Sequence, residues 1–161
     1  IYINGSGGQE PIIFGGGEEI EMAINIATLA DTTDDYVMRL GFCDQSNGTD
    51  CTDGLYFEYN RASSANWTMC AANNGTRTKT ASSTAVATGW VRLKMVVNPA
   101  ASQIDFYVNG TNIGTIASTN LPTTSARTTQ PEFVIAKTAG TGSRTFKIDY
   151  FQLRNSLTTA R

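Results

Sequence analysis

The chain has 161 residues, enough for one hydrophobic core, and no shift in composition divides it into two domains. Charged residues make up only 16% of the chain and the net charge is −2, which argues against nucleic-acid binding, because that requires a dense basic patch. The chain has no histidine, so serine–histidine and cysteine–histidine relays and His-containing zinc sites are excluded. No apolar run approaches the roughly 20 residues of a membrane span.

Strand patterns begin close to the N-terminus and continue along the chain. Ile1 already reads as strand, so we expect the chain to be a processed product or part of a longer protein. Between residues 18 and 29, apolar and polar side chains alternate strictly, which favours a strand over a helix. Further strands are expected at 36–42, 55–60, 67–71, 77–81, 90–97, 103–108, 133–137 and 144–153.

The segment 89–112 gives the clearest pattern. Val91, Leu93, Met95 and Val97 share one face of a strand, and Trp90, Arg92, Lys94 and Val96 share the other. After the next strand, Asn109-Gly110 is the dipeptide that best suits a two-residue type I′ hairpin turn. In the last strand the alternation places Phe146, Ile148 and Tyr150 on one face and Phe151 and Leu153 on the other. About ten short strands separated by turn signals predict an all-β fold, an antiparallel jelly-roll β-sandwich spanning residues 1–161.

Three cysteines are present, and Cys43 and Cys51 flank a polar loop. A disulfide between these two would close the loop as a hairpin tip, but their redox state is left open because the compartment is unknown. Cys70 is left over within a strand, where a small buried side chain is the simpler interpretation than a reactive thiol.

The same loop carries the only candidate metal site. Asp44, Asn47, Asp50 and Asp53 offer hard oxygen ligands at the short spacing that Ca²⁺ prefers. Because Asp and Asn are also ordinary turn residues, and the spacing matches no EF-hand, a bare polar turn is the alternative.

A glycan-binding site would need an exposed aromatic ring beside amide or carboxylate groups. Trp67 is a candidate for such a ring, with Asn66 before it and the Asn73-Asn74 turn after it. Tyr56 is a further candidate, because it lies on the strand face opposite the predicted core. The alternative for Trp67 is that it fills the core of the sandwich, and Trp90, at the start of its strand, is expected to be packed.

Several blocks occur in an order typical of one family. They are Gly41-Phe42, Asp53–Tyr59, Asn66-Trp67, Asn73-Asn74, Gly89-Trp90, Leu93, Val97-Asn98, Phe106–Gly110, Lys137–Gly140, Arg144 and Asp149–Phe151. Together, over about residues 18–153, they resemble the concanavalin A-like (lectin/glucanase, laminin-G-like) jelly-roll domains found in bacteriophage tail-fibre and other virion appendage proteins. The resemblance implies two curved antiparallel sheets and a virion or cell-surface setting, but no particular sugar.

An enzyme is not expected. Enzymes of this superfamily carry Glu-x-Asp-x-x-Glu on one strand, and the chain has no such spacing; Glu18, Glu19 and Glu21 come closest, but the first two face opposite ways. Glu58 and Asp105 are isolated strand acids.

The expectation is therefore a non-enzymatic virion module, in a tail fibre, head fibre or decoration element, whose lectin-like surface adheres to host glycans. The alternatives are an architectural virion subunit without sugar binding and a carbohydrate-binding module of a secreted bacterial protein. The expected location is the virion surface or, for the last alternative, the cell exterior. A homo-oligomer, for which a trimer is plausible on family grounds, is expected.

Overall fold

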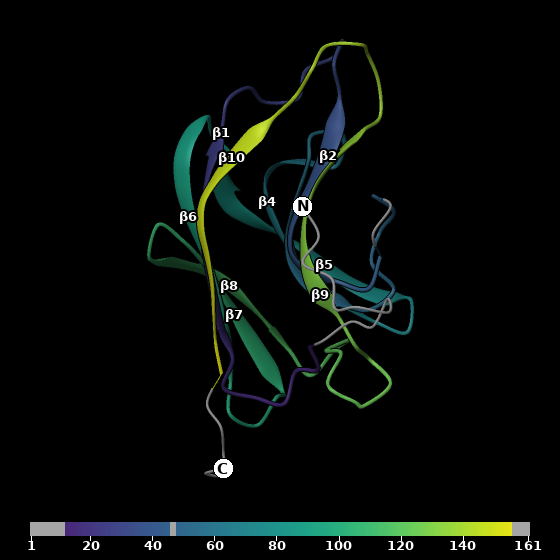
Figure 1. Ribbon diagram of the computed structural model, residues 1–161, viewed down its shortest axis with the longest axis vertical. Coiled ribbons are helices and arrows are strands. Elements are labelled where there is room, and N and C mark those ends of the chain that lie inside the picture. The colour runs from purple at the N-terminus through teal and green to yellow at the C-terminus, as the bar shows by residue number, and fades with distance from the viewer. Residues whose placement is uncertain (1–11, 46–47, 156–161) are drawn as a thin grey trace.

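In the computed structural model, residues 12–45 and 48–155 are described, and they form ten strands and no helix. Two sheets of antiparallel neighbours lie face to face (Figure 1). The first sheet has the order β10 (Phe146–Arg154), β1 (Glu19–Ile26), β6 (Gly89–Val97), β7 (Gln103–Val108) and β8 (Thr111–Ala117). The second has the order β5 (Thr76–Ala85), β4 (Ser64–Asn73), β3 (Gly54–Asn60), β2 (Tyr36–Cys43) and β9 (Gln130–Lys137). The predicted all-β sandwich is confirmed, and the segment 18–29 contains strand β1 and no helix.

The core lies between the sheets and is built from the apolar set of each alternating strand. Phe57 on β3 and Phe106 on β7 meet edge to face across the sandwich, with ring centroids 5.1 Å apart. Aromatic pairs in this geometry contribute about 0.5–1.5 kcal/mol beyond the area that they bury. The two sheets are thus joined at the centre by ring packing as well as by aliphatic contacts.

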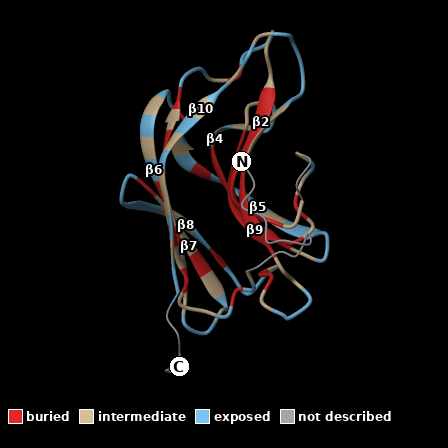
Figure 2. Ribbon diagram, in the orientation of Figure 1, coloured by how far each residue is buried: buried red, intermediate tan, exposed pale blue. Residues whose placement is uncertain are grey.

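The outer faces of the two sheets differ in exposure. β1 alternates between half-buried and buried residues, as expected for a strand with one face open to solvent, whereas all eight residues of β2 are buried. Figure 2 shows this contrast, with β2 red over its length and the first sheet mixed. On the outer face of the second sheet, Cys51 from the loop between β2 and β3 packs with Cys43, Tyr56, Cys70 and Ala72 in a separate small cluster. The open face is therefore the outer face of the first sheet.

The pairing of β10 with β1 contains a bulge that the sequence pattern did not reveal. Tyr150 lies opposite Ala23 and Ile148 opposite Ile24, which leaves Asp149 as the extra residue. The bulge shifts the alternation by one, so Phe151 and Leu153 pack against the core on the same side as Phe146 and Ile148. The prediction that Tyr150 shares a face with Phe146 and Ile148 is wrong for this reason; its hydroxyl hydrogen-bonds Glu21 instead.

The hairpin between β7 and β8 turns at Asn109-Gly110, as predicted. Both residues have positive φ, 50° and 83°, and Val108 pairs with Thr111 across the turn. Within the described part of the chain, no helix is long and apolar enough to cross a membrane.

Candidate functional site

Trp67, proposed from the sequence as a sugar-stacking ring, lies in the core. Only 1% of its surface is exposed, and its ring packs edge to face on Phe57 with centroids 5.9 Å apart. A sugar has no access to either face of this indole. The structure shows the core alternative for Trp67, because β4 directs it inward together with Met69 and Ala71.

The other residues proposed beside Trp67 have structural partners. Tyr56 lies on the outer face of the second sheet as expected, but it is 1% exposed and its hydroxyl donates a hydrogen bond of 2.7 Å to Asp50. The side-chain amides of Asn66 and Asn73 donate to the carbonyls of Ser82 and Leu121, and Asn74 occupies a turn with a φ of 52°. These residues do not form a common exposed surface.

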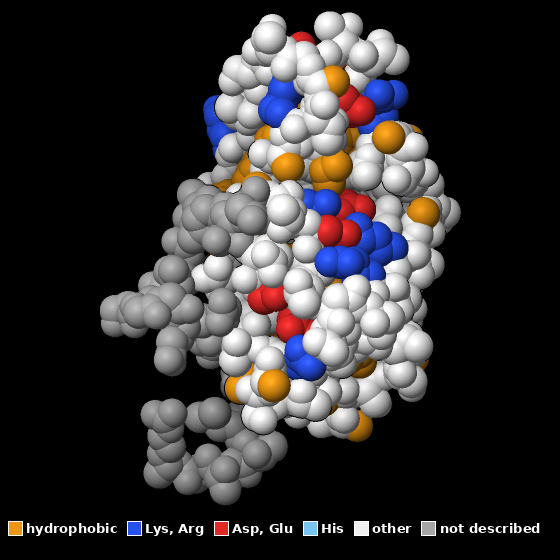
Figure 3. Space-filling view, turned by 90° about the vertical axis from the view of Figure 1, so that its right-hand side faces the viewer, with side chains coloured by type: hydrophobic (Ala, Val, Ile, Leu, Met, Phe, Trp, Pro, Cys, Tyr) orange, Lys and Arg blue, Asp and Glu red, His pale blue; other side chains and the backbone are white. Residues whose placement is uncertain are grey.

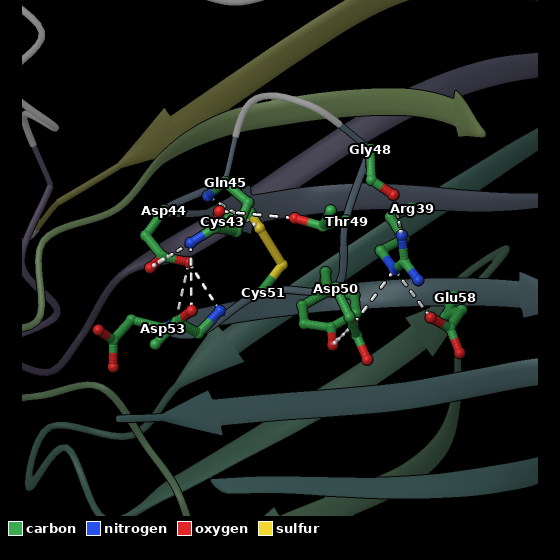
Figure 4. The surroundings of a disulfide bond; sticks show 12 residues. Arg39, Cys43, Asp44, Gln45, Gly48, Thr49, Asp50, Cys51, Asp53 and Glu58 are labelled. Carbon is green, nitrogen blue, oxygen red and sulfur yellow. Dashed lines mark hydrogen bonds and ion pairs between the residues drawn. A yellow bond between two sulfur atoms is a disulfide. The ribbon is translucent and has the colours of Figure 1, made fainter. Parts of the chain in front are cut away.

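The acidic loop after β2 does not gather its carboxylates around one point. Asp44 accepts hydrogen bonds from the backbone N–H groups of Thr52 and Asp53 (Figure 4). Asp53 in turn accepts one from Asn74 N–H. Asn47 falls outside the described residues. Carboxylates that already accept N–H groups act as turn-forming side chains, so this arrangement does not fit the expected Ca²⁺ site.

Asp50 belongs instead to a charge network that fastens the loop to the second sheet. The network consists of Arg39, Asp50, Glu58, Arg77 and Lys79. Lys79 Nζ lies 2.8 Å from a carboxylate oxygen of both Asp50 and Glu58, and Arg39 Nε lies 2.9 Å from Glu58. Basic and acidic side chains lie side by side on this face of the molecule (Figure 3).

Burial alone raises the pKa of Asp50, but hydrogen bonds from Lys79 and Tyr56 outweigh it and lower the pKa below its usual value. Arg77 adds a hydrogen bond of 2.6 Å from its Nε to the Cys51 carbonyl. The network is satisfied internally, which indicates a structural role for its residues.

Cys43 and Cys51 form a disulfide that closes the same loop (Figure 4). Cys70 is a free thiol with no exposed surface, and burial raises its pKa well above the usual value. A buried thiol of this kind has little thiolate to react.

Among the described residues, the exposed aromatic ring is that of Trp90, on the open face of the first sheet. The indole is 59% exposed, whereas most large apolar side chains of the described residues are buried. Val91, Leu93, Met95 and Val97 take the inward positions of β6, so the alternation turns Trp90 outward. The expectation that Trp90 is packed is wrong. The two-residue alternation of β6 places its side chain on the outer face, although the ring is apolar.

Polar groups surround this ring. A hollow of about 330 Å³ is lined by Trp90, Arg92, Asn109 and Asp149, together with Ala23 and Val91. We call these four residues the Trp90 platform. A second hollow of about 150 Å³, lined by Glu21, Arg92, Lys94 and Gly110, adjoins it at Arg92.

Each polar member of the platform is positioned by the fold. Asn109 Oδ1 accepts a hydrogen bond of 2.9 Å from the Arg92 backbone N–H, and Asn109 N–H donates one of 2.7 Å to the Arg92 carbonyl. Arg92 Nε lies 3.6 Å from Glu21 Oε1, and the Arg92 side chain is 59% exposed. The bulge in β10 provides Asp149. The platform therefore combines an aromatic ring, a guanidinium, an amide and a carboxylate, the mixture that stacks on a sugar and bonds its hydroxyls.

The sequence contained the signal for Trp90 but not for the whole platform. The alternation of residues 90–97 already separated Trp90, Arg92 and Lys94 from the inward set. Asp149 joins the site only through the bulge, and Asn109 only through the pairing of β6 with β7.

A family model described as "SO2946-like, C-terminal domain" matches residues 5–149. The chain belongs to this family. No curated protein matches the sequence.

Solved structures share the fold of this SO2946-like domain at low sequence identity. A glycoside hydrolase family protein from Mycobacterium thermorestibile matches with a TM-score of 0.62 and 16% identity, over 88% of this chain and 64% of that one. A β-1,3-glucanase from Mycobacterium marinum matches with a TM-score of 0.62 and 16% identity, over 91% of this chain and 66% of that one. The protein of unknown function SO2946 from Shewanella oneidensis MR-1 matches with a TM-score of 0.56 and 17% identity, over 86% of this chain and 56% of that one. The chain spans less than two thirds of the length of each of these structures, and the likeness shows a shared jelly-roll β-sandwich fold.

Proposed function

We propose that this SO2946-like domain is a non-enzymatic carbohydrate-binding module that holds glycans on the Trp90 platform. The observation that carries the proposal is the indole of Trp90, 59% exposed beside a hollow with three polar side chains. Keeping a large apolar ring in water forgoes about 1.5–3 kcal/mol of burial energy, so a ligand that covers it recovers part of that energy.

The shape of the site suits a short saccharide segment. A hollow of about 330 Å³ is at the lower end of the range for small-molecule sites, roughly 300–1,000 Å³. The hollow is shallow and continues toward Lys94, whose Nζ lies 4.9 Å from the centroid of the Tyr107 ring. A second aromatic residue along the same face would support the next sugar of a chain.

The proposal includes no catalytic step. Hydrolysis of a glycosidic bond needs one carboxyl group that holds its proton near neutral pH and a second carboxylate across the bond. On the platform, Asp149 is exposed on β10, and Glu21 is bound by Arg92 and the Tyr150 hydroxyl. In the charge network, Asp50 and Glu58 are both paired with Lys79.

The setting that we propose is the surface of a bacteriophage particle, in a tail fibre, head fibre or decoration element. The motif resemblance supports it, and so does the weakly charged, Asn- and Thr-rich surface. The glycan would then be a host cell-surface polysaccharide, and a trimer or other symmetric oligomer would raise its avidity. A carbohydrate-binding module of a secreted bacterial protein would use the same platform.

The test is binding of the purified protein to a panel of bacterial surface polysaccharides and their oligosaccharides. We expect saturable binding that falls about 5- to 30-fold in Trp90→Ala, equivalent to about 1–2 kcal/mol, and that is largely retained in Trp90→Phe. Tyr56→Phe is the matched control on the opposite outer face and leaves the affinity unchanged. Equal affinities of wild type and Trp90→Ala would contradict the proposal, and release of reducing sugar from any ligand would contradict its non-enzymatic part.

An architectural role is the second candidate, and the same exposed indole favours it, because tryptophan is also enriched at protein–protein contacts. In that case Trp90 would be covered by a neighbouring subunit. Light scattering distinguishes the two: an architectural contact predicts that Trp90→Ala lowers the oligomeric state while the panel shows no binding.

A further inference from the structure

Two buried side chains with polar atoms that lack a hydrogen-bond partner among the described residues lie beside the disulfide, on the outer face of the second sheet. Glu132 on β9 is 1% exposed, and neither of its carboxylate oxygens has a hydrogen-bond partner within the described ranges. Gln130, also on β9, is 3% exposed, and its Oε1 is likewise unpartnered. Leaving one such buried polar group unsatisfied costs about 1–3 kcal/mol, and more for a charged one.

Strand pairing brings these two side chains to the cysteines. Gln130 lies directly opposite Cys43, and Glu132 lies opposite Gly41, which has no side chain to fill the space above it. The Sγ atoms of Cys43 and Cys51 and a carboxylate oxygen of Glu132 all lie within 4.8 Å of one another. All three residues are buried.

We propose that, in the dithiol state of the chain, Cys43, Cys51 and Glu132 bind a thiophilic divalent cation of the zinc class, with Gln130 Oε1 as the fourth ligand. Two thiolates and two oxygens form a tetrahedral donor set that Zn²⁺ accepts. With Zn–S bonds of about 2.3 Å, the sulfur atoms of such a site lie roughly 3.8 Å apart. The Cα atoms of the two cysteines are 5.3 Å apart, so side-chain rotation alone provides that separation.

The disulfide and the cation would each hold the same loop closed, and because both use the same two sulfur atoms only one can be present at a time. Reduction by a dithiol breaks the S–S bond with two electrons and two protons, giving two thiols, while the reductant becomes a disulfide. Binding of the cation then releases both thiol protons to solvent and leaves two thiolates and one carboxylate on the metal. Oxidation by a disulfide oxidant reverses the sequence and expels the cation.

The metal form would keep the loop closed over the second sheet when the disulfide is absent. The loop also contributes Asp50 to the charge network, and its backbone carbonyl at Cys51 accepts from Arg77. These contacts hold Cys51 over the sheet independently of the disulfide, so the donor set is partly preorganised before the cation arrives.

The experiment titrates the fully reduced protein with Co²⁺ and then with Zn²⁺ in competition with a chromophoric chelator. We expect one Co²⁺ per chain with a thiolate-to-metal charge-transfer band that Zn²⁺ displaces, and no band in the oxidised protein. Glu132→Gln keeps both thiols and the loop, and it should weaken Zn²⁺ binding at least about tenfold. Cys70→Ala is the matched control and leaves the affinity unchanged.

Cys43→Ser should abolish the band, and circular dichroism checks that this variant is folded. If that variant is unfolded, the test is the melting temperature of the reduced wild type. Zn²⁺ must raise this temperature, because a cation bound only by the native state stabilises it. No band in the reduced wild type, full Zn²⁺ affinity in Glu132→Gln, or an affinity that depends on Cys70 would each overturn the proposal.

Discussion

The two tryptophans are expected to contribute very unequally to stability, although both lie in strands. Trp67 is 1% exposed and packs on Phe57, which in turn packs on Phe106 across the sandwich. Trp67→Ala therefore removes a ring at the end of a row of three aromatic rings joined by two contacts. Trp90 is 59% exposed, and truncating it leaves no internal cavity.

The expected magnitudes differ several-fold. Trp→Ala in a core costs about 3–5 kcal/mol in unfolding free energy, from lost transfer energy and the cavity left behind. That is a large share of a total stability of roughly 5–15 kcal/mol. Surface substitutions change it by about 0.5 kcal/mol or less, which is our expectation for Trp90→Ala.

Urea unfolding of the oxidised protein, followed by far-ultraviolet circular dichroism, measures both variants. With a slope of about 2 kcal/mol per molar urea, Trp67→Ala should lower the midpoint by about 1.5–2.5 M and Trp90→Ala by about 0.25 M or less. A loss below 1 kcal/mol in Trp67→Ala, or above about 1.5 kcal/mol in Trp90→Ala, would refute the assignment of the two rings to core and surface.

Three further results are expected. Tyr56→Phe removes the hydroxyl that donates to Asp50 and should lower the unfolding free energy by about 1–2 kcal/mol, measured in urea; no change would mean that this hydrogen bond does not form in solution. Reducing the Cys43–Cys51 disulfide in metal-free buffer should cost roughly 2.5 kcal/mol in the chain-entropy model for a separation of 8 residues, and an unchanged midpoint would contradict closure of the loop by the bond. The third result concerns pH. Hydrogen bonds from the Lys137 side chain and the Gly142 N–H lower the pKa of Asp34 below its usual value in the folded state, so the stabilising effect of Asp34 is full above the unfolded-state pKa and is lost as the pH falls through the folded-state pKa. Unfolding midpoints measured between pH 5 and pH 2 should accordingly fall less steeply in Asp34→Asn than in wild type, and parallel curves would contradict the assignment.

Much of the fold could be predicted from the sequence, because it depends on alternation and turn chemistry. The inward set of β6 and the Asn109-Gly110 turn follow from local pattern alone, and the structure has both. The face of the sheet on which Tyr150 lies could not be predicted. It depends on the bulge at Asp149, and that bulge depends on how β10 pairs with β1, which local sequence does not encode.

The candidate site was harder to predict, because exposure is a tertiary property. The sequence pattern predicts the correct face for Tyr56, but Cys51, from the loop between β2 and β3, packs over it. Trp67 and Trp90 look alike as strand tryptophans, and only the position of each in its alternation separates core from surface. The sequence groups the aspartates in one loop, but their partners come from strands distant in the chain, such as Lys79 on β5.

The measurement that tests the central claim most directly is a calorimetric titration of wild type and of Trp90→Ala, side by side, with the oligosaccharide from the polysaccharide panel that binds most tightly. The account predicts a dissociation constant about 5- to 30-fold higher in the variant at unchanged folding stability. Identical dissociation constants would contradict it and move the binding surface away from the Trp90 platform.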